Sequence, residues 1–107
     1  MKVLLIRPGE VPEVGELNGY DEMRDYIGGC FETVNAFGYK IVCNDEFLYN
    51  NSPYNVTIGD VQYFGNIFVC KVGRVNGELD FVGLDDADIN SPEFAVHFLM
   101  CKGYLII

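Results

Sequence analysis

Turn signals built on glycine divide this chain into short segments, and they constrain its fold more than any other feature. Pro8-Gly9, Gly28-Gly29, Asn35–Gly38 and Asn76-Gly77 are such signals, because these residue types adopt turn conformations readily. Most segments between them are rich in β-branched and aromatic residues, which favour extended structure. We therefore expect a fold dominated by short β-strands.

Two pairs of these segments are predicted to form antiparallel hairpins, each around a glycine-containing turn. Within the last segment, alternation places Leu79 and Phe81 toward the core and Glu78 and Asp80 toward water. Two further extended pieces precede the hairpins. The predicted strands are residues 2–6 and 14–17, the pair 30–34 and 38–43, and the pair 65–72 and 78–84.

Helix signals occur twice. Asn18 or Asp21 can cap a helix that stops at Gly28-Gly29, with a hydrophobic face made of Tyr20, Met23, Tyr26 and Ile27. Ser91-Pro92 is typical of a helix start, so we expect a helix over 92–101 and a short strand or tail over 104–107. A rival interpretation makes FAVHFLMC and YLII two strands. The sequence thus predicts a single α+β domain over residues 1–107, an antiparallel or mixed sheet of about five strands with about two helices.

Charge restricts the classes of partner. Of 107 residues, 50% are hydrophobic and 14% aromatic, so the chain is expected to fold, yet 16 acidic residues against 7 basic ones give a net charge of -9. Binding to nucleic acid needs clustered lysine or arginine, and the seven bases here are scattered singly. Direct binding to DNA, RNA or an anionic membrane is therefore not expected.

The cysteines and the opening segment indicate in which cellular compartment the protein is expected. Cys30, Cys43, Cys70 and Cys101 show no C-x-x-C spacing, and most have a hydrophobic neighbour, which predicts reduced thiols in the core. The hydrophobic run in MKVLLIRPGE is too short for a signal peptide or a membrane span. We expect a cytoplasmic protein.

Motifs for metals and catalysis are weak. Asp86–Asn90 resembles the start of a calcium loop, but Ser91 replaces the turn glycine and His97 replaces the final glutamate. His97 and Cys101 are spaced to form half of a zinc site on a helix, and no further ligand pattern accompanies them. Phosphate-binding glycine loops and nucleophile elbows are absent from the sequence. We therefore predict no metal, no cofactor and no catalytic residue.

One segment has the composition of a binding surface. Residues 44–55 combine four asparagines with three aromatic residues, although a loop packing its own aromatics would look the same. Tyr63 extends this surface, and the carboxylates between residues 80 and 88 offer an acidic one. The predicted binding residues are Tyr49, Asn50, Asn51, Tyr54, Asn55, Tyr63, Asp80, Asp85, Asp86 and Asp88.

Several segments together resemble a small family of domains of unknown function found in Firmicutes genomes, plasmids and phages. The matching segments are the opening Met1–Ile6 with Pro8, Gly28-Gly29 followed by FETV, Tyr39–Glu46, Gly59–Val69, and GELDFVGL followed by acidic residues 85–88. The resemblance brings no catalytic residues. It implies a mobile-element protein, a setting in which small acidic proteins often bind host machinery.

Three functional hypotheses follow. The first is a non-enzymatic protein that binds a basic protein partner, for instance the nucleic-acid-binding surface of a host defence protein. The alternative is a small-ligand protein that holds a nucleotide or metabolite near Tyr49, Tyr54, Asn55 and Tyr63. An uncharacterised enzyme is a third, and the hydrophobic YLII segment leaves a homodimer open.

Overall fold

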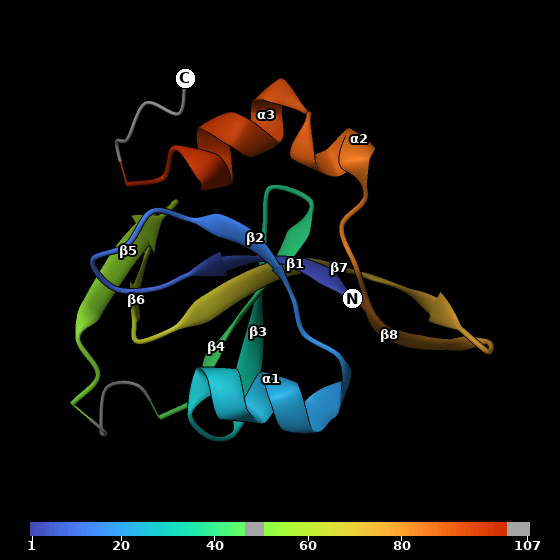
Figure 1. Cartoon of the computed structure of the whole chain (residues 1–107), viewed down its shortest axis with the longest axis horizontal. Helices are drawn as coiled ribbons and strands as arrows, with labels where there is room; N and C mark the ends of the chain where they lie inside the picture. Colours follow the sequence, from blue (N-terminus) through green and yellow to red (C-terminus); the bar gives the residue numbers. More distant parts are fainter. Residues whose placement is uncertain (47–50, 103–107) are drawn as a thin grey trace.

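A central antiparallel sheet organises the molecule (Figure 1). The computed structural model describes residues 1–46 and 51–102. The sheet order is β2-β1-β7-β4-β3, and β8 pairs with the far end of β7. The predicted α+β class and both predicted hairpins are confirmed. The strands of this sheet are β1 (Lys2–Ile6), β2 (Glu13–Glu16), β3 (Phe31–Ala36), β4 (Tyr39–Asn44), β7 (Ile67–Val75) and β8 (Glu78–Val82).

The long strand β7 has two different halves. Its first half lies between β1 and β4, and Ile67, Phe68, Val69 and Cys70 are all completely buried. Its second half pairs only with β8, so this hairpin extends away from the body as an arm (Figure 1). Its turn is the predicted Asn76-Gly77, with both residues at positive φ, as a two-residue hairpin loop requires.

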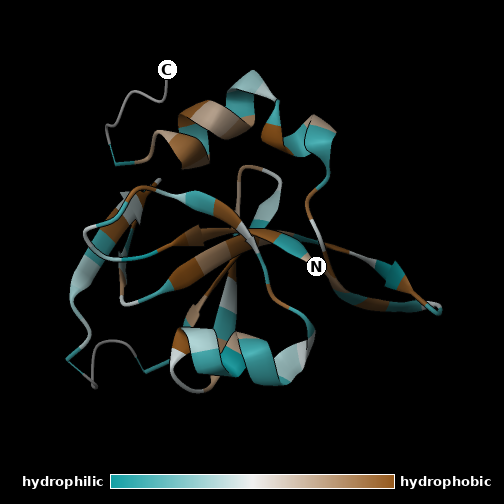
Figure 2. Ribbon diagram, in the orientation of Figure 1, coloured by the Kyte–Doolittle hydropathy of each residue, from teal (hydrophilic) through white to brown (hydrophobic). Residues whose placement is uncertain are grey.

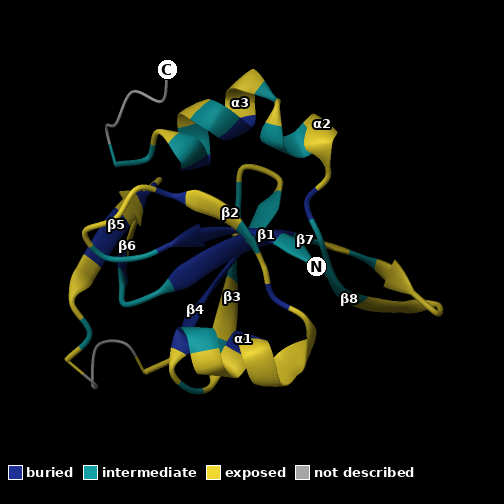
Figure 3. Ribbon diagram, viewed as in Figure 1, coloured by how far each residue is buried: buried dark blue, intermediate teal, exposed yellow. Residues whose placement is uncertain are grey.

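One orientation predicted for the arm is wrong. Leu79 was expected to face the core, but its side chain is 70% exposed. Alternation does put Leu79 on the same face as Phe81, which is half-buried. Leu79 stays exposed because the arm passes beyond the elements that cover the sheet (Figure 3).

The helix α1 (Gly19–Ile27) covers one face of the sheet. It ends at Gly28, which adopts the left-handed conformation, as the sequence predicted. Met23 and Ile27 are buried against the sheet, whereas Tyr20 is 49% exposed and lies at the edge of the contact. The outer side of α1 is mostly hydrophilic (Figure 2). The buried residues on this face are Val3, Leu5, Leu17, Met23, Ile27, Val42, Phe68 and Cys70, which we call the α1-side core.

Two covers lie on the opposite face. One is the hairpin of β5 (Tyr54–Ile58) and β6 (Val61–Phe64), and the other is the C-terminal helical segment. That segment comprises α2 (Asp86–Ile89), α3 (Pro92–Phe94) and the π-helical turn η1 (Ala95–Leu99). The buried residues here are Leu4, Ile6, Ile41, Cys43, Val56, Ile58, Tyr63, Ile67, Val69, Leu84, Phe94 and Phe98, which we call the C-terminal-side core.

Residues 92–99 are helical, so the helix interpretation is confirmed over the rival pair of strands. Ser91 caps the segment by accepting a hydrogen bond from the backbone N–H of Phe94. The expected strand or tail at 104–107 lies outside the described residues. Among the described residues, no helix has the length and apolar character that crossing a membrane requires.

Two further differences from the sequence predictions concern strands and thiols. Residues 54–58 form β5, where the sequence had placed part of a binding loop. All four cysteines are free thiols, and Cys43 and Cys70 are buried as expected. Cys30 is exposed, contrary to prediction, because it falls in the connection between Gly29 and β3.

Candidate functional site

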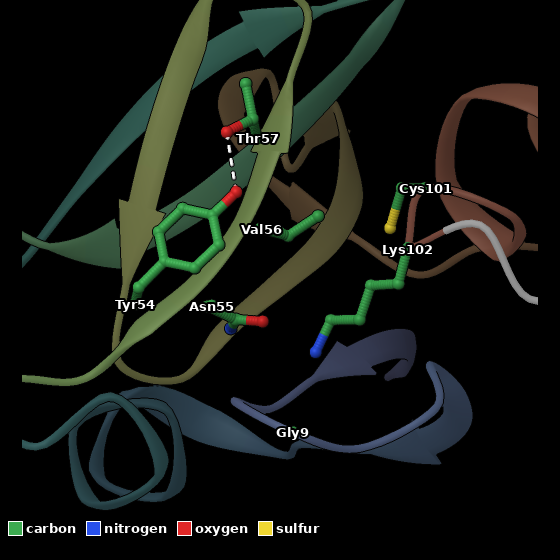
Figure 4. A pocket seen from close by; sticks show the side chains of 7 residues that line it. All are labelled: Gly9, Tyr54, Asn55, Val56, Thr57, Cys101 and Lys102. Atoms are coloured by element: carbon green, nitrogen blue, oxygen red, sulfur yellow. Dashed lines mark hydrogen bonds between the residues drawn. The ribbon is translucent and has the colours of Figure 1, made fainter.

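A cavity of about 380 Å³ lies where three parts of the chain meet. The turn after β1 contributes Gly9, strand β5 contributes one wall, and the end of the C-terminal segment contributes the other (Figure 4). Its volume falls within the range of small-molecule sites. The lining residues are Gly9, Tyr54, Asn55, Val56, Thr57, Cys101 and Lys102.

Asn55 is the most informative residue of this cavity. Its side chain is 6% exposed, and its Nδ2 donates to the backbone oxygen of Ile6 at 2.9 Å and of Gly65 at 2.6 Å. Its Oδ1 is buried and has no hydrogen-bond partner among the described residues. The two donated bonds fix the amide orientation, so this oxygen is held as a positioned acceptor.

Lys102 supplies a cation on the opposite wall. Its Nζ donates to the backbone oxygen of Arg7 and, at 2.9 Å, to that of Glu10. Burial lowers the pKa of this ammonium group. Figure 4 shows the Lys102 side chain extending toward Asn55, with Gly9 on the adjacent turn.

The remaining walls are mixed in character. The Tyr54 hydroxyl and Thr57 Oγ1 are hydrogen-bonded at 2.7 Å, and the Tyr54 ring is 53% exposed at the rim (Figure 4). Burial raises the pKa of the Cys101 thiol, which keeps it protonated at neutral pH. The cavity therefore combines one aromatic surface, one cation and one unpaired acceptor.

A second surface lies on the other side of the molecule, where α1 meets the β7–β8 arm. Three rings contact one another there: the centroids of Tyr20 and Phe31 and of Tyr20 and Phe81 are 6.3 Å apart, and those of Phe31 and Phe81 are 5.9 Å apart. Val72 and Leu79 continue this surface along the arm, since each shares a face with Phe81. We call Tyr20, Phe31, Val72, Leu79 and Phe81 the aromatic patch.

The predicted acidic residues separate into two places. Asp80 accepts a hydrogen bond from the Tyr20 hydroxyl at 2.8 Å and lies beside the aromatic patch. Asp85, Asp86 and Asp88 lie at the start of α2, where Asp85 and Asp88 form a reciprocal capping box. Lys71 Nζ lies 2.7 Å from Asp88 and 3.4 Å from Asp85, and Lys2 Nζ lies 3.2 Å from Asp86.

Asp88 is the most strongly perturbed of these carboxylates. Burial would raise its pKa, but hydrogen bonds from Lys71, from the backbone N–H of Asp85 and from the Tyr39 hydroxyl outweigh burial and lower the pKa to about 2. The α2 carboxylates thus stabilise the fold locally.

The structure brings only part of the predicted site together. Tyr54 and Asn55 line the same cavity, whereas Asn51 is exposed and does not line it. Tyr63 lines a different cavity of about 290 Å³ beside Phe37, and its hydroxyl has no hydrogen-bond partner among the described residues. Tyr49 and Asn50 lie outside the described residues. Sequence reasoning missed Gly9 and Lys102, because their approach to Asn55 depends on tertiary structure.

The buried thiols and His97 lie outside this cavity. Burial raises the pKa of Cys43 and of Cys70 to about 12, so neither is a thiolate at neutral pH. Residues 1–46 and 51–102 contain no cluster of three or more histidine, cysteine or carboxylate side chains placed to hold a metal. The ring of His97 instead stacks on Phe37, with centroids 3.7 Å apart.

A comparison with protein families assigns the chain. Residues 1–98 match the family model described as "Domain of unknown function (DUF3846)". The chain belongs to the DUF3846 family. No curated protein and no solved structure matches this DUF3846 domain significantly. The match includes Tyr54, Asn55 and the whole aromatic patch but ends before Lys102.

Proposed function

We propose that this DUF3846 domain is a non-enzymatic binding protein that captures a basic protein partner through the aromatic patch. The observation that carries this proposal is the exposure of hydrophobic side chains at one place, with Leu79 70% and Tyr20 49% exposed. Exposed aromatic residues next to aliphatic ones are typical anchors of protein interfaces. The arm formed by β7 and β8, which carries Val72, Leu79 and Phe81, extends away from the body (Figure 1).

The negative charge of the chain favours a partner with a basic surface. Carboxylates adjoin the patch: Asp21 follows Tyr20 on α1, while Glu78 and Asp80 flank Leu79 on β8. The whole chain carries a net charge of -9, so its field attracts a basic protein and repels an acidic one. Such attraction accelerates association and weakens as salt screens it.

The biological setting belongs to the same proposal. The resemblance to proteins of Firmicutes genomes, plasmids and phages favours a mobile-element protein acting in the host cytoplasm. A basic nucleic-acid-binding surface of a host defence or nucleic-acid-processing protein has the charge this domain would complement. Occupying that surface would block access of nucleic acid.

A capture experiment with matched variants tests the proposal. The tagged chain, its Tyr20→Ala/Leu79→Ser double variant and a Val96→Ser control are incubated at low salt with nuclease-treated lysate of a Firmicutes host. Val96 is 62% exposed on η1, away from the patch, so it matches Leu79 in exposure. Any recovered protein is identified, purified and titrated with each chain.

The proposal requires a basic partner whose dissociation constant rises with salt. It also requires the double variant to bind at least about tenfold more weakly, while Val96→Ser binds normally. Equal binding by the double variant contradicts the proposal. Sedimentation of the purified chain as a dimer that the double variant disrupts also contradicts it, because the patch would then serve self-association.

A further inference from the structure

The unpaired oxygen of Asn55 calls for a hydrogen-bond donor. A buried carbonyl oxygen without a partner is costly, and most such groups in native proteins are satisfied by protein, water or ligand. Asn55 cannot rotate its amide to relieve this, because its Nδ2 already donates to Ile6 and Gly65. The missing donor must therefore come from the cavity side.

The ammonium group of Lys102 can donate a further hydrogen bond to an acceptor in the same cavity. An ammonium group has three donors, and two are used by the backbone oxygens of Arg7 and Glu10. Among the described residues no acceptor takes the third, which can therefore bind a neutral acceptor such as a carbonyl oxygen. A multiply charged anion is disfavoured, since the Glu10 carboxylate is near Lys102 and the chain is strongly acidic.

The exposed ring of Tyr54 favours a planar ligand. The Tyr54 ring packs edge-on against Phe64, with centroids 5.6 Å apart and planes at 78°, and it remains 53% exposed. An aromatic ring at the mouth of a cavity stacks readily on a flat heterocycle. The volume of the cavity, its polar groups and the exposed Tyr54 ring thus all favour a small, neutral, planar ligand.

We propose that this cavity binds a neutral, planar small molecule carrying a hydrogen-bond donor beside an acceptor, the edge that a nucleobase presents. The donor of the ligand pairs with Asn55 Oδ1, and its acceptor pairs with Lys102 Nζ. The site is separate from the aromatic patch, so this proposal is independent of partner binding.

Nuclear magnetic resonance titration of the full ¹⁵N-labelled chain tests the site directly. Uracil is the probe, and 1,3-dimethyluracil is the matched control, because it has the same ring and carbonyls but no N–H donor. Uracil is expected to shift the side-chain amide signals of Asn55 and the backbone signals of Gly9 and Thr57. Dimethyluracil is expected to bind at least about tenfold more weakly, the loss that accompanies one unsatisfied buried acceptor.

Variants of Lys102 complete the test. Replacing Asn55 would also strip the partners of two backbone oxygens and could unfold the chain, so the ligand pair above probes that residue instead. Lys102→Met is expected to weaken uracil binding by about tenfold. Lys40→Met is the control, because Lys40 lies on β4 and does not line this cavity.

Two results would overturn the proposal. One is no saturable shift with uracil up to its solubility limit, which would mean that solvent alone satisfies Asn55. The other is equal binding of uracil and dimethyluracil, which would show that Asn55 Oδ1 does not select the ligand.

Discussion

The two faces of the central sheet are covered unequally. The C-terminal side has two covers, the β5–β6 hairpin and the segment from α2 to η1, and its core contains the completely buried Phe98. On the opposite side, α1, a helix of nine residues, is the one cover that the described residues form. As a result the α1-side core continues outward into the partly exposed rings of the aromatic patch.

We expect the two faces to serve different purposes: the doubly covered face stabilises the fold, and the singly covered face binds a partner. The doubly covered face packs aromatic rings tightly, for example Phe94 against Phe98 at 5.1 Å between centroids. The singly covered face leaves hydrophobic area exposed, where a partner can bury it. We therefore expect substitutions on the C-terminal side to change unfolding free energy, and substitutions at the aromatic patch to change binding.

The largest effect is expected from Phe98→Ala. Phe98 is completely buried and contacts the rings of Tyr39 and Phe94, so its truncation should cost about 4 kcal/mol of unfolding free energy. Met23→Ala on α1 should cost about 2 kcal/mol, because a short helix on one side can adjust around the gap. Urea denaturation measures both. A larger loss of unfolding free energy for Met23→Ala than for Phe98→Ala would contradict the expectation that the C-terminal-side core contributes more to stability.

Acid should destabilise the C-terminal side through Asp88. Its side chain is 15% exposed and its pKa is lowered to about 2, so its contribution is present above the unfolded pKa and is lost as pH falls. We expect a loss of about 2 kcal/mol between about pH 4 and pH 2. Unfolding free energies measured across this range should be flatter for Asp88→Asn.

A smaller, coupled effect is expected at the turn between β3 and β4. Phe37 has a φ of 52°, a conformation that costs a bulky residue about 1 kcal/mol, and its stacking on His97 offsets this cost. Phe37→Asn should therefore be nearly neutral in the native chain and stabilising by about 1 kcal/mol in a His97→Ala background. A double-mutant cycle measures this. Strictly additive free energies would show that the stacking contributes nothing.

The smallest effect on stability is expected at Leu79 on the β7–β8 arm. Leu79→Ser should change the unfolding free energy by less than about 0.5 kcal/mol, because the side chain is already 70% exposed. Thermal denaturation and sedimentation would check this. A large loss of stability would mean that Leu79 packs against something within the folded chain, and the patch would then be part of the core.

Local signals predicted the elements but not their arrangement. Asn76-Gly77, Gly28-Gly29 and Ser91-Pro92 mark a turn, a helix end and a helix start because each depends on backbone preferences of a few adjacent residues. The strand order could not be predicted in the same way. It depends on β7 pairing with strands far away in sequence, and many apolar segments here have similar composition.

The candidate site was predicted only in part for the same reason. Tyr54 and Asn55 stood out through residue type, and both line the cavity. Lys102 carried no local signal, since a lysine in a turn just beyond the end of a helix usually faces solvent. The exposure of Leu79 was missed because alternation defines a face but not how far the covering elements reach.

The position of β1 beside β7 has a consequence for synthesis. β1 leaves the ribosome before β7, and the strand that completes its pairing follows roughly 60 residues later. At a translation rate of about 5 to 20 residues per second, the hydrophobic KVLLI segment lacks its β7 partner for several seconds, while β2 and α1 follow it directly. During that interval the β1–β2 hairpin and the packing of α1 on Val3 and Leu5 can shield this hydrophobic segment.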